Sequence, residues 1–94
     1  MTFGGTRLMA FVAVESAAAG GETITNHLRP LVQFKGNDYP GMVIECPAQI
    51  DPGKSGEMLL GFIHADKVQI AKYDAFKLFN KGAFLAKGIV LRTL

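Results

Sequence analysis

The residue types in this chain that are best suited to chemistry are one cysteine, two histidines and a lysine beside glycine. Cys46 and His64 are the types that form a nucleophile and its general base. Their positions give no sign that they meet, so we expect Cys46 to be a buried structural cysteine. His27 and His64 are far apart in the sequence, and neither has a neighbouring ligand at metal-site spacing.

A phosphate-binding loop is the chemistry that Gly53-Lys54-Ser55 would provide. That motif requires a glycine five positions before Gly53, and Ala48 stands there. The residues that follow form a strand-like run, so no helix N-terminus faces a phosphate. We therefore expect a tight turn here. Glu45 and Glu57 are expected to be surface carboxylates, and the sequence predicts no enzyme activity, no metal, no cofactor and no bound nucleotide.

Positive charge is concentrated in the last third of the chain. The chain has ten Lys and Arg against eight Asp and Glu, a net charge of +2. Residues 64–94 carry six basic and two acidic side chains, whereas residues 1–63 carry four and six. This basic third favours a polyanionic partner, although a solvated lysine face is the plainer explanation. Phe76, Phe79 and Phe84 lie among these lysines, as core residues or as a stacking surface for nucleic acid.

The elements that must position these side chains are short strands separated by turns. Eleven glycines and four prolines divide a chain that is 49% hydrophobic, which is enough to form a core for one domain over residues 1–94. Turns are predicted at Gly20-Gly21, Gly36-Asn37, Pro40-Gly41, Pro52-Gly53 and Lys81-Gly82. Strands are predicted at Arg7–Val14, Leu31–Phe34, Met42–Cys46, Met58–His64, Ala75–Phe79 and Ala83–Leu91. This pattern indicates a small antiparallel barrel or sandwich.

Two segments also have features of helices. Leu8–Ala19 is rich in alanine, although its Phe and Val residues favour a strand. Asp66-Lys67-Val68-Gln69 resembles a capping box, and apolar residues follow it at helical spacing. Periodicity leaves the segment Asp66–Phe79 open between helix and strand.

The segment Met58–Ala65 is apolar on both faces of a strand. Such a strand passes through the middle of a protein or lies against another surface. We therefore name Met58, Leu60 and Phe62 as candidate residues of a protein interface, with a partner protein or with a second copy of the chain.

Several segments, in order, resemble the C-terminal barrel domain of the translation elongation factor Tu family. Leu28–Phe34 resembles the Arg-Pro strand of that domain, and Leu8–Val14 with Gly20-Gly21 is similar to its first strand and turn. The likeness continues over about residues 7–92, through Pro40-Gly41, Ile44-Glu45-Cys46-Pro47, Pro52-Gly53, Ile63-His64, Phe76–Asn80, Lys81-Gly82 and Phe84–Val90. The resemblance implies a six-stranded antiparallel β-barrel, with strand plus loop in the segment 66–79.

The resemblance also implies partners. In that family this barrel helps to hold the T arm of aminoacyl-tRNA and contacts the nucleotide-exchange factor. The last hairpin is one place where the family touches tRNA, and of Asn80-Lys81-Gly82 only Gly82 clearly keeps the pattern. The basic stretch ahead of the Arg-Pro strand is replaced by Glu22–His27. The family's GTPase domain and middle barrel are absent from these 94 residues, so no GTP hydrolysis is expected.

Two binding functions follow as expectations. The first is a translation-related module that binds tRNA or other RNA through basic residues, with phosphates as the main binding groups. Its candidate residues are Arg29, Lys77, Lys81, Gly82, Lys87 and Arg92. The second is a protein-interaction barrel, either an adaptor or a homo-oligomer, with no role in nucleic-acid binding. A cytoplasmic protein is expected, because no apolar run reaches the ~18 residues of a membrane span and Leu8–Val14 is too short for a secretory signal.

Overall fold

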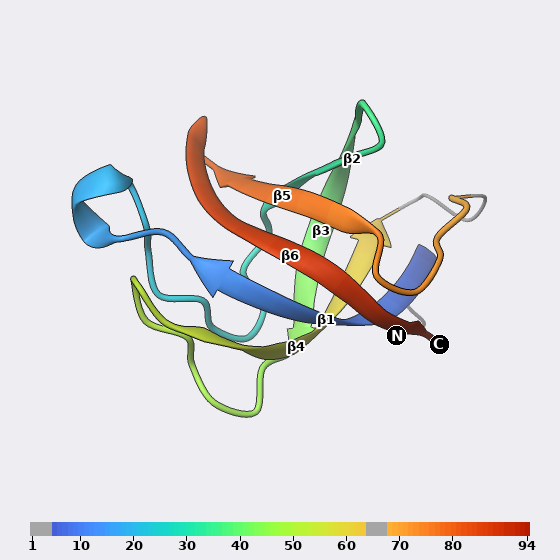
Figure 1. The fold of residues 1–94 in the computed structure, drawn as a ribbon, viewed down its shortest axis with the longest axis horizontal. Helices are drawn as coiled ribbons and strands as arrows, with labels where there is room; N and C mark the ends of the chain where they lie inside the picture. Colours follow the sequence, from blue (N-terminus) through green and yellow to red (C-terminus); the bar gives the residue numbers. More distant parts are fainter. Residues whose placement is uncertain (1–4, 64–67) are drawn as a thin grey trace.

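The chain forms a closed barrel of six antiparallel strands (Figure 1). The structure is a computed structural model that describes residues 5–63 and 68–94. The strands are β1 (Gly5–Val14), β2 (Leu31–Phe34), β3 (Asn37–Glu45), β4 (Ser55–Ile63), β5 (Ala75–Asn80) and β6 (Ala83–Thr93). Around the barrel the order is β1, β4, β3, β2, β5 and β6, and β6 pairs with β1 to close it. The all-β six-stranded antiparallel barrel that the sequence predicts is confirmed.

Alternation along each strand separates the core from the outer surface, because successive side chains of a strand point to opposite faces. In β1 the buried residues are Leu8, Ala10, Val12 and Val14, whereas Arg7 and Phe11, on the alternate positions, are exposed. An aromatic group fills one part of the interior. The Phe62 ring lies edge-on to Phe34, with centroids 5.9 Å apart, and stacks on Tyr39 at 5.3 Å.

Two tight hairpins connect neighbouring strands. Lys35 and Gly36 join β2 to β3 with φ values of 50° and 79°, and Lys81 and Gly82 join β5 to β6 with 53° and 80°. Positive φ at both central residues is the geometry of a type I′ turn, which matches the twist of paired strands. The predicted hairpin at Lys81-Gly82 is therefore confirmed. The first turn is centred one residue earlier than Gly36-Asn37, because Asn37 already belongs to β3.

Pro40-Gly41 is not the turn that the sequence predicts, because both residues lie inside β3. Pro40 pairs with Leu31 of β2, and the Gly41 N–H donates to the Pro30 carbonyl at 2.9 Å. A Cβ on Gly41 would lie 2.6 Å from Val32 Cγ2 and 3.2 Å from the Pro30 oxygen. Glycine therefore serves a close approach between strands at this position, and not a reversal of the chain.

The segment before β5 contains no helix in its described part. Residues 68–74 are irregular and β5 begins at Ala75, so the helix alternative is wrong for residues 68–79 and strand plus loop is correct there. Asp66 and Lys67 of the proposed capping box lie outside the described residues, as does His64. The alanine-rich stretch after β1 forms only the short 3₁₀ helix η1 (Ala17–Ala19), which ends at Gly20 with φ 102°.

Candidate nucleic-acid interface

Two of the predicted basic residues lie directly opposite each other on the outside of the barrel. The pairing of β5 with β6 places Lys77 against Lys87, and both side chains are exposed. The same row continues to Ala13 of β1 beyond Lys87, and to Gln33 of β2 beyond Lys77. Residues from four strands therefore form one line across the outer surface, although Ala13 and Lys87 lie near opposite ends of the sequence.

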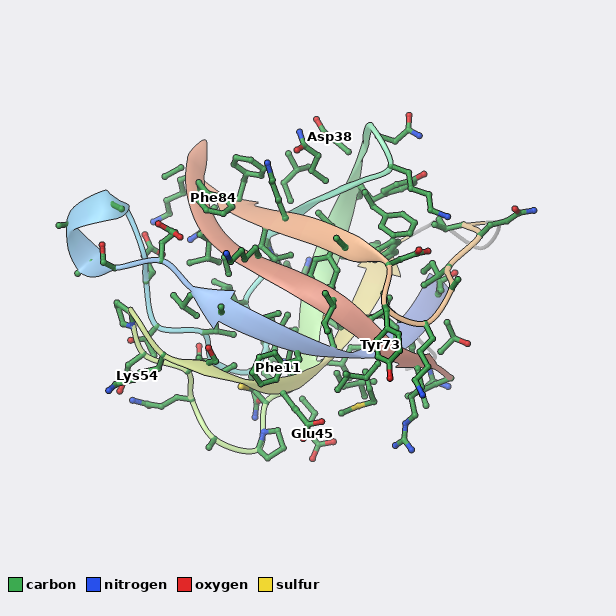
Figure 2. The ribbon with its side chains drawn as sticks, in the orientation of Figure 1. Phe11, Asp38, Glu45, Lys54, Tyr73 and Phe84 are labelled. Carbon is green, nitrogen blue, oxygen red and sulfur yellow. The ribbon has the colours of Figure 1, made fainter. Side chains whose placement is uncertain are left out.

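A groove of about 680 Å³ follows this line. Its floor includes the neighbouring row, in which Phe11 pairs with Ile89 and Ile89 pairs with Ala75. Phe11 is 41% exposed and Ile89 is 37% exposed. The groove thus combines the cationic side chains of Lys35, Lys77 and Lys87 with an apolar floor. Figure 2 shows Phe11 with the other side chains on the barrel.

Gly88 holds the central strand of this surface close to the core. A Cβ on Gly88 would clash with the ring of Phe76 and would lie 2.8 Å from Val12 Cγ1. Without a side chain, β6 packs directly onto that buried ring, and alternation then turns Lys87 and Ile89 outward. Of the three aromatic residues near the lysines, Phe76 belongs to the core, and Phe79 and Phe84 form a half-buried pair with centroids 5.6 Å apart.

The charges of the lysine pair are not neutralised within the part of the chain that the structure describes. Neither Lys77 nor Lys87 has an ion-pair partner among residues 5–63 and 68–94. Like charges directly opposite each other on a sheet repel, which makes the pair a favourable place for an anion. Lys77 and Lys87 are therefore the groove lysines without an ion-pair partner among the described residues, whereas Lys35 is paired with Asp74.

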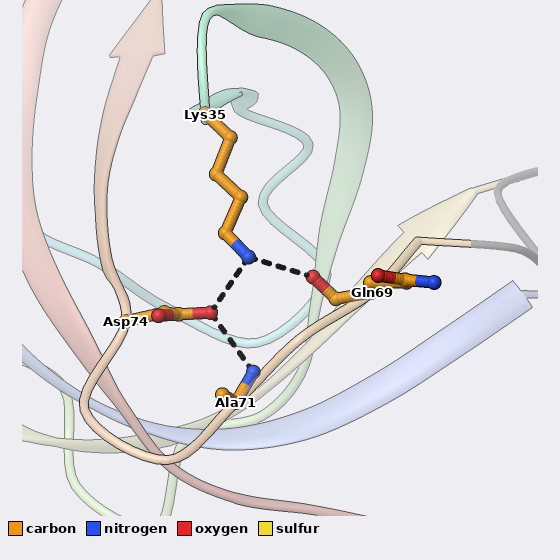
Figure 3. A network of polar contacts seen from close by, with 4 residues as sticks. All are labelled: Lys35, Gln69, Ala71 and Asp74. Atoms are coloured by element: carbon orange, nitrogen blue, oxygen red, sulfur yellow. Dashed lines mark hydrogen bonds and ion pairs between the residues drawn. The ribbon is translucent and has the colours of Figure 1, made fainter.

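One end of the groove is fixed by an ion pair (Figure 3). Lys35, which lines that end, places its Nζ 3.2 Å from Asp74 Oδ2 and 3.2 Å from the Gln69 carbonyl oxygen. Asp74 Oδ2 also accepts a hydrogen bond from the Ala71 N–H at 2.8 Å. That backbone hydrogen bond, with a smaller contribution from Lys35, lowers the pKa of Asp74 below its ordinary value of 3.8. These interactions tie the loop before β5 to the β2–β3 turn.

The remaining predicted basic residues do not join the groove. Lys81 and Gly82 form the exposed tip of the β5–β6 hairpin. Arg29 is exposed and precedes β2, whose Leu31 pairs with Phe79, so Arg29 lies at the same end of the barrel as Lys81. Arg92 lies toward the other end of β6, where it pairs with Met9. The structure therefore brings together Lys77 and Lys87 and separates the others from them.

The burial of the three candidate protein-interface residues contradicts their predicted role. Met58, Leu60 and Phe62 are fully buried and point into the barrel. On the outer face of the same stretch, the apolar residues Leu59 and Ile63 are half-buried. The prediction that a partner binds the three named side chains is therefore wrong, since the barrel core already covers them.

Cys46 has the surroundings of a structural thiol. It is buried, its Sγ donates to the Ala48 carbonyl at 3.0 Å, and its backbone N–H donates to Asn26 Oδ1. Burial raises the pKa of the Cys46 thiol, which disfavours the reactive thiolate. Gly53, with φ 80°, lies in a turn two residues before β4, and Lys54 is exposed, so the tight turn that the sequence predicts here is confirmed.

No other centre of chemistry emerges from the described residues. Within residues 5–63 and 68–94, no group of three or more His, Cys, Asp or Glu side chains is placed to hold a metal ion. Over the same ranges, no helix has the length and apolar character that spanning a bilayer requires.

Phe11, Ile89, Gln33 and Lys35 are groove residues that the sequence interpretation missed. The alternation of inward and outward side chains along a strand could have identified Phe11. Phe11 stands between Ala10 and Val12, so an inward Val12 places Phe11 outward. The meeting of Phe11 with Ile89 depends on the pairing of the first strand with the last, which no local pattern contains.

No protein-family model matches the chain, and no curated protein matches it significantly.

Proposed function

We propose that this protein is a non-catalytic binding module of the cytoplasm that holds RNA in the outer groove of its barrel. The observation that carries the proposal is the opposed pair Lys77 and Lys87, which has no ion-pair partner among the described residues. Phosphate oxygens of RNA are suited to such a pair, since each ammonium group attracts an anionic oxygen from the backbone. Binding of this kind depends strongly on salt and little on sequence.

We propose further that the RNA belongs to translation, with tRNA as the first candidate. The support is the sequence resemblance to the C-terminal domain of the elongation factor Tu family, together with a barrel of the strand number and pairing that this resemblance implies. In this proposal Arg29, Lys81 and Gly82 lie outside the primary binding surface, because they occupy the end of the barrel beyond the groove.

A protein partner is the second candidate function. The observation that favours it is the pair of exposed apolar residues Phe11 and Ile89, which are neighbours across β1 and β6. An adaptor or a self-associating barrel would cover this surface, and its binding would change little with salt because apolar burial drives it.

Charge reversal tests the RNA function. The variant Lys77→Glu/Lys87→Glu is compared with Lys54→Glu, which makes a single charge change at an exposed residue outside the groove (Figure 2). RNA affinity is measured by fluorescence anisotropy, with labelled tRNA and a labelled oligouridine of about ten nucleotides, over a range of salt concentrations.

We expect the double variant to bind RNA more weakly at every salt concentration. The slope of log affinity against log salt should fall by about 1 for each lysine that no longer pairs with a phosphate. Lys54→Glu should retain both the affinity and the slope of the wild type. Equal binding by the double variant and the Lys54→Glu control would contradict the proposal.

A further inference from the structure

The groove floor beside the lysine pair contains an exposed aromatic ring. Phe11 lies in the middle of β1 and is 41% exposed, and its cross-strand neighbour Ile89 is 37% exposed. A single exposed apolar side chain needs no explanation by itself. The position of this ring is what matters, because it lines the same groove as Lys77 and Lys87.

The strand register fixes where the Phe11 ring lies relative to Lys87. Lys87 pairs with Ala13, and Phe11 lies two residues from Ala13 on the same face of β1. Phe11 and Lys87 are therefore diagonal neighbours across two antiparallel strands, a separation of about 7–8 Å that long and aromatic side chains span. A nucleotide that lies across these two strands can place its phosphate near Lys87 and its base near Phe11.

The surrounding charges favour one orientation of such a nucleotide. On the side away from β6, β4 places the exposed Glu57 opposite Phe11. A phosphate is repelled from Glu57 and attracted to the row of Lys77 and Lys87. The base is left over the apolar row of Phe11 and Ile89, where its face covers exposed carbon surface.

We propose that the groove selects single-stranded over double-stranded RNA, with Phe11 as the platform on which a base stacks. This inference rests on the proposed function of RNA binding. A duplex presents phosphates and sugars outward and keeps its bases paired, so it leaves Phe11 uncovered. A single strand offers a phosphate to the lysines and an unpaired base to Phe11 at the same time. Basic grooves with aromatic floors hold unpaired nucleic acid in this way. Every base has an aromatic face, so little base preference is expected.

The test replaces the ring with two variants. Phe11→Leu keeps an apolar side chain of similar reach and removes the aromatic face, whereas Phe11→Tyr keeps the face. Both changes are on the outer surface of β1, so the core is unaltered. Binding to labelled single-stranded oligouridine and to a labelled RNA duplex of equal length is measured by fluorescence anisotropy. The proton shifts of the Phe11 ring during titration of the wild-type protein give a readout that needs no variant.

We expect wild-type protein to bind the single strand more tightly than the duplex. Phe11→Leu should weaken single-strand binding between about 5- and 150-fold, the range for one stacked base. The same variant should leave duplex binding and the salt slope unchanged, since both lysines still pair with phosphates. Phe11→Tyr should bind as the wild type does, and the Phe11 ring protons should shift upfield when the single strand is added.

The possible negative results distinguish failure of single-strand selection from failure of RNA binding. If Phe11→Leu binds the single strand like the wild type, or the duplex binds as tightly, single-strand selection is wrong. RNA binding itself survives that result provided that Lys77→Glu/Lys87→Glu still weakens it. If wild-type protein binds neither RNA at low salt, both proposals are wrong. A dimer that Phe11→Leu dissociates, without an effect on RNA, would assign the ring to a protein interface and overturn the stacking role.

Discussion

At the scale of single residues, Asp74 connects the loop before β5 to the groove. Its carboxylate accepts from the Ala71 N–H and pairs with Lys35, and these interactions favour its charged form. The pKa of the Asp74 carboxyl is lower in the folded protein than in the unfolded chain. The Asp74 charge therefore contributes fully to stability at pH values above the unfolded pKa, and this contribution is lost as pH falls through the folded pKa.

Asp74→Asn is the substitution that reports this contribution. The amide keeps an oxygen that accepts from Ala71 but loses the charge that pairs with Lys35. We expect the variant to melt at a lower temperature than the wild type at neutral pH. The difference should be constant above about pH 5 and should shrink as pH falls below about 4. Thermal melts monitored by circular dichroism over this pH range measure it.

Asp38→Asn is the matched control for that experiment. Asp38 is exposed in β3 and forms no ion pair or side-chain hydrogen bond with the described residues. The difference in melting temperature between wild type and Asp38→Asn should not shrink as pH falls. A difference between wild type and Asp74→Asn that stays the same from neutral to acidic pH would contradict the role given to the Asp74 charge.

At the scale of elements, the β5–β6 hairpin sets the register of the two strands that carry the lysine pair. The Lys81-Gly82 turn brings β5 against β6, and with it Lys77 against Lys87. Its first residue is a lysine at φ 53°, a conformation that asparagine adopts more readily than lysine. The turn is therefore formed at some conformational cost.

Lys81→Asn should stabilise the barrel and leave RNA binding nearly unchanged. We expect the free energy of unfolding to rise by about 0.5 kcal/mol, the low end for a single stabilising substitution. Affinity for RNA should stay within about twofold of the wild type, since one exposed charge outside the groove is removed. Urea unfolding and anisotropy measure the two effects. Lys81→Ala, which removes the same charge without the turn preference, should show no gain in stability.

The sequence predicts the strands well because their boundaries depend on local features. Glycine and proline mark most of the turns, and apolar runs of strand length lie between them. Pro40-Gly41 was misread because the same pair that makes a turn also fits a place where β3 approaches Val32 closely. The burial of Met58, Leu60 and Phe62 agrees with one predicted alternative, a strand through the middle of the protein. The other alternative, an interface, arose because apolar residues outside a small barrel cannot be told from those inside by composition alone.

At the scale of the whole molecule, closure of the barrel assembles the groove. Phe11 comes from the first strand, Lys87 and Ile89 from the last, and Lys77 from the strand before it. The basic character of the C-terminal third could be read from the sequence. The separation of Arg29 and Lys81 from Lys77 and Lys87 follows from the pairing of β5 with β2 and β6. The diagonal position of Phe11 relative to Lys87 requires the pairing of β1 with β6. That pairing is long-range, so local patterns do not contain it.

The most direct test of RNA binding in the groove is a two-dimensional amide NMR titration of isotope-labelled protein. Single-stranded oligouridine is added at about 20 mM salt and then at about 200 mM salt, where exposed charges are strongly screened. We predict that the largest shifts map to Ala13, Gln33, Lys77 and Lys87 and decrease as salt rises. Shifts confined to the Lys81-Gly82 hairpin and Arg29, or an unchanged spectrum at low salt, would contradict this assignment.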